Sequence, residues 1–189
     1  MKRTVPPLAP SLLISVPHLR DPNFDHSVVL LLEHDGEGSM GLVINRETDH
    51  AMSDFCALQD LEYLGPKEAM VFVGGPVEPT QGFVLHGAPL EVPPDVAGRE
   101  VAAGIWFGAD MDLLRHLTRQ SAIPFRLLVG YAGWAPGQLD AEIAAGAWIP
   151  RPATRELVFH PSPSEVWGLS LRDIGIDPRT LVKGGAAPN

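Results

Sequence analysis

The chain contains a single cysteine, Cys56, among its 189 residues. One thiol cannot form an internal disulfide framework, and it cannot supply a zinc site built on several thiolates. A cysteine content this low fits the reducing conditions of the cytosol. We therefore expect a cytoplasmic protein. At this length a single domain buries enough surface to fold without covalent staples.

Positive charge is also scarce. The sequence has 14 Lys and Arg residues against 23 Asp and Glu residues, and its net charge is −9. Attraction between basic side chains and phosphates supplies most of the non-specific affinity for nucleic acids. The few basic residues are scattered, and no helix-turn-helix pattern is present. Direct binding of nucleic acid is therefore not expected.

Long hydrophobic runs are missing as well. No run approaches the roughly 18 apolar residues that a membrane helix needs. The first 19 residues, "MKRTVPPLAPSLLISVPHL", resemble a signal peptide, because Lys2 and Arg3 precede apolar residues. However, prolines interrupt that stretch and no small-residue cleavage site follows it. We interpret it as a first β-strand and expect no association with a membrane.

Complete catalytic motifs are absent. No H-E-x-x-H occurs, and no two histidines lie three or four apart on a predicted helix. The segment "EGSMG" approaches the nucleophile elbow G-x-S-x-G, but Glu37 replaces the first glycine, and a strand follows where a helix should. We interpret Ser39 as a turn hydroxyl and Cys56 as a small buried hydrophobe. The sequence thus indicates no catalytic residue, no metal and no cofactor.

The apolar patterns that are present predict many strands and few helices. Strands are predicted at 11–17, 27–34, 39–46, 69–77 (ending in a turn), 82–87, 99–108 and 125–134, and helices at 52–61, 111–120, after Gly137 and after Ser162. The strands occur both as hairpins and between helices. This order predicts an α+β fold: a single domain with a mixed, mostly antiparallel, partly rolled sheet flanked by short helices.

Some local features are predicted more closely. Residues 27–34 are apolar on both faces, which is typical of a central strand. The glycine within 99–108 indicates a bulge in one continuous strand. Asp110 is expected to cap the following helix. Ser162 and Glu165 fit a capping box at the start of the last helix.

The segment "GYAGWAPGQLDAEI" at 130–143 places several glycines before a helix, as a phosphate-binding loop does. It lacks the Rossmann and P-loop spacings, and no Lys or Ser follows to meet a phosphate. Asp140 and Glu142 would also repel a bound anion. We therefore predict an architectural role, in which the glycines let the strand pass close to a neighbour while Trp134 and Trp148 fill the core.

Polar residues at predicted strand ends are the only candidates for a ligand-binding cleft. They are Glu33, His34, Asn45, Arg46 and His86, together with the backbone N–H groups of Gly74 and Gly75. In one interpretation Glu33 or His34 handles protons and Arg46 holds an anionic group. In the other, the side chains are hydrogen-bonded caps at strand ends and the glycines form a tight turn.

Four ordered segments carry a resemblance to a known family. They are "DPNF" at 21–24, "EHDGEGSMGLVINR" at 33–46, "GGPVEPTQGFVLH" at 74–86 and "GYAGWAPGQLDAEIAAGAWI" at 130–149. Together they resemble the AlgH-like, or YqgE-like, family of bacterial proteins, over about residues 11–182. Residues 1–10 and 183–189 are expected to be a flexible extension and a frayed tail. Relatives usually end in Gly-His-Ala, whereas this chain has Ala186 at the histidine position.

The resemblance implies an α+β fold on a partly rolled antiparallel sheet, and it implies no catalytic residues. Some members are called transcriptional regulators, from a link to alginate production. Two hypotheses stay open. The first is a non-enzymatic cytosolic protein that regulates through a protein or small-ligand partner. The second is an enzyme or small-ligand binder with a cleft at the strand ends. Direct DNA binding is a third hypothesis, which the charge disfavours.

Overall fold

The structure is a computed structural model, and it describes residues 7–19, 21–87 and 95–177. Within these ranges the strands form one ten-stranded sheet. The strands are β1 (Ser11–Ser15), β2 (Val28–Asp35), β3 (Gly38–Val43), β4 (Glu47–Ala51), β5 (Met70–Val73), β6 (Val77–His86), β7 (Arg99–Ala102), β8 (Ile105–Gly108), β9 (Phe125–Trp134) and β10 (Trp148–Arg151). The helices are α1 (Met52–Leu58), α2 (Met111–Thr118), α3 (Gln138–Ala144), α4 (Arg155–Val158) and α5 (Val166–Arg172), with a short 3-10 helix at Pro163–Glu165.

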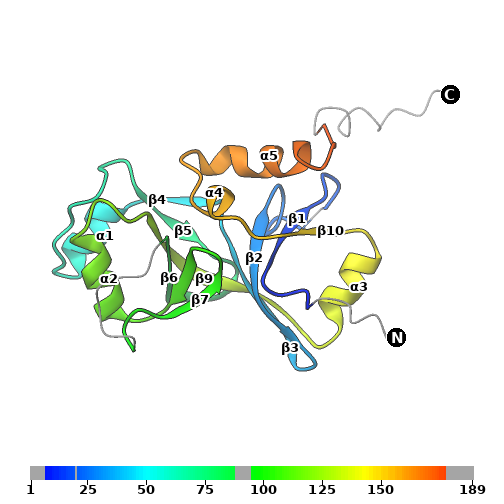
Figure 1. The fold of residues 1–189 in the computed structure, drawn as a ribbon, viewed down its shortest axis with the longest axis horizontal. Helices are drawn as coiled ribbons and strands as arrows, with labels where there is room; N and C mark the ends of the chain where they lie inside the picture. The colour runs from blue at the N-terminus through cyan, green and yellow to red at the C-terminus, as the bar shows by residue number, and fades with distance from the viewer. Residues whose placement is uncertain (1–6, 20, 88–94, 178–189) are drawn as a thin grey trace.

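The strand order is β10-β1-β2-β3-β9-β6-β8-β7, while β5 pairs with β9 and β4 pairs with β5. Among the described strands, only the β5–β9 pair is parallel. The sheet is curled, with α1 and α2 at one end, α3 at the other and α5 across the top (Figure 1). The predicted α+β class and the mostly antiparallel, rolled sheet are confirmed.

Strand β9 joins the two parts of the sheet. Along one edge it pairs with β6; along the other it pairs first with β5 and then, near its end, with β3. The change of neighbour falls at Gly130, which has a φ of +70°. A Cβ atom added there would lie 2.3 Å from the Gly75 carbonyl oxygen, and one added at Gly75 would lie 2.1 Å from the Tyr131 carbonyl carbon. The close passage predicted for the glycines of the 130–143 segment is confirmed at Gly130, whereas Gly137 has no such neighbour.

Three hydrophobic clusters surround the sheet. The largest lies between one face of the sheet and helices α4 and α5. The second lies beneath α1 and α2, and the third lies beneath α3. Along β2, Val28 and Leu30 enter the first cluster, whereas Val29 and Leu31 enter the third. Both faces of β2 are therefore buried, as expected of a central strand.

Two local predictions are wrong and one is confirmed. Residues 99–108 form the hairpin β7–β8, because Gly104 adopts a φ of +69° and turns the chain. Ser162 makes no capping hydrogen bond through its side chain, so the capping box does not form. Asp110 does cap α2, because its side chain accepts a hydrogen bond of 2.6 Å from the Asp112 N–H.

The ends of the chain limit what the structure says of the predicted extension and tail. Residues 1–6 of the extension, the whole tail at 183–189 and the Ala186 position lie outside the described residues. Among the described residues, no helix is long and apolar enough to cross a bilayer.

Candidate functional site

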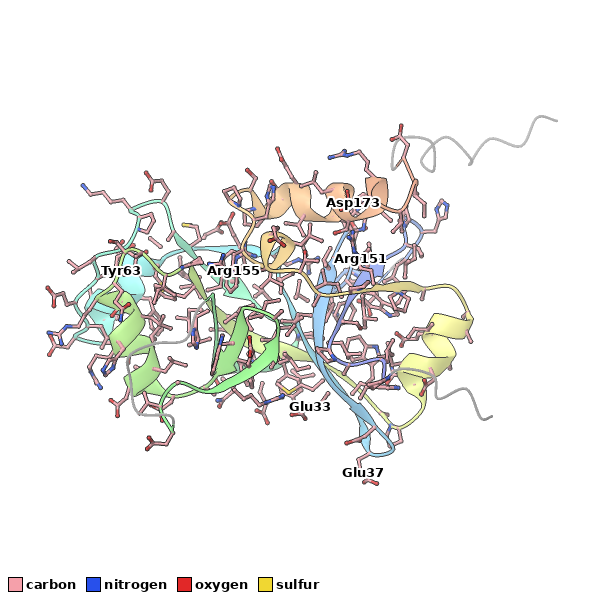
Figure 2. The ribbon with its side chains drawn as sticks, viewed as in Figure 1. Glu33, Glu37, Tyr63, Arg151, Arg155 and Asp173 are labelled. Atoms are coloured by element: carbon pink, nitrogen blue, oxygen red, sulfur yellow. The ribbon has the colours of Figure 1, made fainter. Side chains whose placement is uncertain are left out.

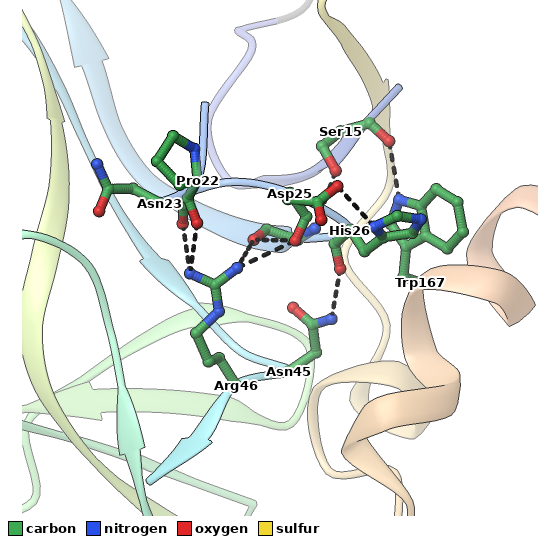
Figure 3. Close-up of polar contacts among 9 residues, drawn as sticks. Ser15, Pro22, Asn23, Asp25, His26, Asn45, Arg46 and Trp167 are labelled. Atoms are coloured by element: carbon green, nitrogen blue, oxygen red, sulfur yellow. Dashed lines mark hydrogen bonds and ion pairs between the residues drawn. The ribbon is translucent and has the colours of Figure 1, made fainter. Parts of the chain in front are cut away.

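Arg46, one of the predicted binding residues, holds the turn that precedes β2. Its Nη1 donates to the carbonyl oxygens of Pro22 and Asn23, the latter at 2.7 Å. Its Nη2 donates to the Asp25 carbonyl oxygen at 3.0 Å and to Ser27 Oγ at 3.2 Å. Figure 3 shows the guanidinium surrounded by these acceptors. The contacts match the interpretation of Arg46 as a hydrogen-bonded cap.

Asn45 fixes the same region from the neighbouring position. Its Oδ1 accepts a hydrogen bond from the Val28 N–H at 2.8 Å, and its Nδ2 donates to the His26 carbonyl oxygen at 2.9 Å. The His26 ring lies edge-on to Trp167 with centroids 4.1 Å apart, and Trp167 Nε1 donates to the Ser15 carbonyl oxygen. These contacts connect the end of β3, the start of β2 and helix α5 (Figure 3).

Glu33 and His34 have separate partners. Glu33 Oε1 accepts a hydrogen bond of 3.1 Å from Arg99 Nη2. The Nδ1 of His34 lies 2.8 Å from Ser39 Oγ, and its Nε2 lies 3.4 Å from Asp140 Oδ1. His34 therefore joins the β2–β3 hairpin to helix α3, whereas Glu33 joins β2 to β7.

His86 and the glycine pair are used inside the fold. His86 is fully buried, its ring stacks on Trp106 with centroids 6.0 Å apart, and its Nε2 lies 3.0 Å from the Ala97 carbonyl oxygen. The Gly74 N–H donates to Val129 of β9. The structure brings Asn45 and Arg46 together but gives Glu33, His34 and His86 different surroundings. A binding role for any of them stays a prediction.

Ser39, His34 and Asp140 form an arrangement that the sequence did not reveal. Their contacts, at 2.8 and 3.4 Å, follow the order of a Ser-His-Asp triad. Asp140 is 65% exposed, so it orients the imidazole only weakly. Ser39 also lies beside Glu33 and other carboxylates, which oppose the negative charge that develops in acyl transfer.

A half-enclosed pocket of about 530 Å³ lies in the described part of the chain. It lies where the start of β9 meets the segments at 63–70, 120–124 and 159–163. Its lining is mostly apolar. We call it the Arg126 pocket, because Arg126 is the buried charged residue in its lining. Tyr63, another lining residue, lies at the end of the molecule that carries α1 and α2 (Figure 2).

Arg126 is only 7% exposed. Its Nη1 donates to the Ile44 carbonyl oxygen, and its Nη2 donates to the His160 carbonyl oxygen at 2.7 Å. The guanidinium carbon lies 4.6 Å from the centre of the Phe72 ring, within the range of a cation–π contact. These contacts fix the guanidinium in one position against the pocket wall.

The charge of Arg126 has no close counter-ion in the described ranges. None of the ion pairs found there, all within 4.0 Å, includes Arg126. Burial lowers the pKa of Arg126 from its ordinary value to about 10, and the negative charge of Glu47 offsets part of this effect. Arg126 was not among the residues predicted from the sequence. Its position as a charged residue inside the apolar strand "FRLLVG" could have indicated a buried cation.

A second concave surface, which we call the acidic groove, lies between the β2–β3 hairpin and strands β6 and β9. It has a volume of about 720 Å³ and is more open than the Arg126 pocket. Its carboxylates come from Glu33, Asp35, Glu37 and Glu78. Figure 2 shows Glu33 and Glu37 on the same side of the molecule. Of the predicted binding residues, only Glu33 lines this groove.

The described residues contain no group of three or more His, Cys, Asp or Glu side chains that could hold a metal ion. The spacing G-x-G-x-x-G does occur at 36–41, but these residues form the β2–β3 hairpin. The dinucleotide-binding motif instead requires a strand followed by a helix.

The fold places this chain in the class of single-domain α+β proteins built on a curled, mostly antiparallel sheet. The model of the AlgH-like family matches residues 12–179. The chain belongs to this family. A UPF0301 protein of Myxococcus xanthus is 45% identical over 181 residues, covering 94% of this chain and 96% of the relative. A UPF0301 protein of Anaeromyxobacter sp. strain K is 37% identical over 185 residues, covering 94% and 93%.

Solved structures show the same fold. The AlgH protein of Pseudomonas aeruginosa, determined in solution, superimposes with a TM-score of 0.71 at 30% identity and full coverage of both chains. A crystal structure from Corynebacterium diphtheriae gives a TM-score of 0.69 at 29% identity, covering 92% of this chain and 90% of the other. The family resemblance predicted from the sequence is confirmed.

Proposed function

We propose that this protein is a non-enzymatic regulatory protein that binds a small molecule in the Arg126 pocket. One observation supports the proposal most directly, which is a half-enclosed, mostly apolar pocket of about 530 Å³ with a buried charged side chain in its lining. Small-molecule sites typically have volumes of roughly 300–1,000 Å³ and combine apolar walls with a few fixed polar groups.

The chemical state of the pocket favours binding over proton transfer. Burial raises the pKa of Tyr63, so its hydroxyl stays a neutral hydrogen-bond donor at neutral pH, and it donates to the Pro66 carbonyl oxygen. Arg126 stays charged, because a pKa of about 10 lies well above neutral pH. His160 Nδ1 accepts a hydrogen bond of 3.1 Å from the Ser162 N–H. These groups recognise a ligand but are poorly arranged to move a proton.

A ligand in this pocket would connect segments that are far apart in the sequence. It would contact the 63–70 segment, the start of β9 and the 159–163 segment. A molecule that binds only the folded arrangement stabilises it by mass action. Binding would therefore hold these segments together and change the surface that they offer to a protein partner. We place this activity in the cytoplasm, in keeping with the single buried cysteine.

The test is a thermal-shift and NMR screen of the full chain against a library of small metabolites. At least one compound should raise the melting temperature and shift amide signals at the pocket. The variant Ala122→Trp should abolish both effects, because Ala122 is an exposed lining residue whose replacement fills the pocket. Ala144→Trp, an exposed position on α3, should leave them intact. Equal binding to both variants, or no binding compound, would count against the proposal.

A hydrolytic activity is the second candidate, supported by the Ser39–His34–Asp140 contacts. It shares His34 with the hypothesis of an enzyme with a strand-end cleft, but its serine nucleophile was not predicted from the sequence. A fluorophosphonate probe should label wild-type protein but not Ser39→Ala if the serine is an activated nucleophile. No labelling of the wild type would eliminate this candidate. We favour the binding function, because the acidic groove beside Ser39 opposes an oxyanion.

Direct action on DNA is the least supported function. The net charge of −9 repels the phosphate backbone. Regulation of transcription would then act through a protein partner. Binding curves on duplex DNA should stay flat even at low salt, whereas a salt-dependent shift would revive this function.

A further inference from the structure

The chemistry around Arg126 indicates which ligands the pocket selects. A guanidinium has five N–H donors in a planar fork, and carboxylates match this fork with two parallel hydrogen bonds. Among the described residues, the acceptors of Arg126 are the carbonyl oxygens of Ile44 and His160, which carry no formal charge. A buried cation is stabilised best by a paired anion. A ligand with a negative group would supply what the described side chains do not place within ion-pair distance.

The other charged residues of the pocket limit the size of that negative charge. Glu47 and Glu68 also line it, and both are exposed at its margin. Their carboxylates repel a ligand with several negative charges, such as a phosphate ester. The pocket therefore favours a single carboxylate beside Arg126 over a polyanion.

The remaining lining indicates the body of the ligand. Aromatic and aliphatic side chains dominate it, with Phe72, Ile123, Phe125 and Phe159 among them. Such walls gain stability from contact with an apolar body, and ring faces accept another ring edge-on or offset. A pocket of about 530 Å³ is large enough for a ring with a short side arm.

We propose that the Arg126 pocket binds a small organic acid with one carboxylate and an apolar, ring-sized body. The inference rests on the proposed function and specifies its ligand class. In the bound state the carboxylate pairs with the Arg126 guanidinium, and the body packs against the aromatic wall. The exposed Glu47 carboxylate works against the bound anion, so its charge weakens binding.

The test titrates the isotope-labelled full chain in NMR with three probes that share a phenyl ring and a three-carbon arm but differ in charge. They are 3-phenylpropionate, the neutral 3-phenylpropanol and the cationic 3-phenylpropylamine. The acid should bind at least about tenfold more tightly than either of the others, a ratio that one favourable charge contact supplies. Amide shifts should concentrate at the start of β9 and in the 159–163 segment.

Two kinds of variant test the role of charge. Arg126→Met removes the guanidinium but keeps an unbranched apolar side chain, so it should make the acid and the alcohol bind equally. Arg126→Lys keeps the charge but loses the fork, so it should retain only part of the preference. Glu47→Gln removes the competing charge at an exposed position and should tighten acid binding about threefold. If Arg126→Met fails to fold, the other two variants still decide the matter.

The outcomes separate the ligand class from the function. Equal or tighter binding of the alcohol or the amine to wild-type protein would overturn the proposed class while leaving a ligand pocket in place. Weaker acid binding in Glu47→Gln would also overturn it. If no probe binds but the metabolite screen finds another ligand blocked by Ala122→Trp, only the ligand class fails. If neither experiment finds a ligand, the proposed function fails with it.

Discussion

Replacing Glu142 by alanine would test whether one carboxylate organises the tryptophan pair beneath α3. Glu142 Oε2 accepts hydrogen bonds from Trp134 Nε1 at 2.9 Å and from Trp148 Nε1 at 2.8 Å. Its Oε1 accepts a third from Gln138 Nε2 at 2.8 Å. The two rings are 6% and 3% exposed and lie edge-to-face with centroids 5.9 Å apart. The substitution therefore leaves two largely buried indole N–H groups without their acceptor.

The expected loss follows from those two donors. A buried donor left without a partner costs about 1–3 kcal/mol. Glu142 is half-buried, so water reaches part of the site and the lower half of that range applies to each donor. We expect Glu142→Ala to lower the free energy of unfolding by about 3 kcal/mol, a large share of the typical total of about 5–15 kcal/mol. Glu142→Gln keeps an acceptor oxygen and should cost about 1 kcal/mol.

Urea denaturation followed by circular dichroism and tryptophan fluorescence would measure these values. The matched control is Asp140→Ala, which removes an exposed carboxylate from the same helix and should cost less than about 1 kcal/mol. Near-ultraviolet circular dichroism should also change in Glu142→Ala, because the rings lose their fixed geometry. If Glu142→Ala costs no more than the control, water replaces the carboxylate without loss and the reasoning is refuted.

Three further predictions concern the scaffold. Gly130→Ala should cost more than about 4 kcal/mol in urea denaturation, because its Cβ would overlap the Gly75 carbonyl oxygen. Gly137 has a similar φ of +71°, but a Cβ added there would meet no neighbouring atom within 4 Å, so Gly137→Ala should lower the free energy of unfolding by about 1–2 kcal/mol. Equal losses for the two variants would contradict the close passage at Gly130. The Cys56 thiol is buried and its pKa is raised by burial, so it should react slowly with Ellman's reagent until the protein unfolds; rapid native reaction would exclude this. Arg46→Lys should speed hydrogen exchange at the amides of residues 23–27, because one ammonium cannot replace the two nitrogens that hold this turn; unchanged exchange would show that the turn is stable without Arg46.

Several elements could be predicted from the sequence because their signals are local. The run at 27–34 predicts a strand that is apolar on both faces, and residues 28–32 of β2 are buried on both faces. Asp110 precedes a periodic apolar pattern, and it caps α2. In each case a few neighbouring residues carry the whole signal, since helix and strand periodicity record which side chains face the core.

Other elements depend on pairing with distant parts of the chain. β4 (Glu47–Ala51) is largely exposed and lacks a strand-like apolar pattern, yet it is a strand because it pairs with β5. The sequence pattern of residues 99–108 predicts one strand, but in the structure the segment forms a hairpin that turns at Gly104. Both features are decided by hydrogen bonds between strands, which local patterns do not specify.

By itself the sequence determined the class of fold, the central strand and the close passage of the chain at Gly130. Only the tertiary structure decided where a ligand could bind. The predicted strand-end residues Asn45 and Arg46 hold a turn, whereas Arg126 meets a carbonyl oxygen 82 residues away, at Ile44, and lines a pocket. The physical reason is that burial patterns depend on residues that are neighbours in the sequence, whereas a binding site is assembled from distant segments that come together only when the chain packs.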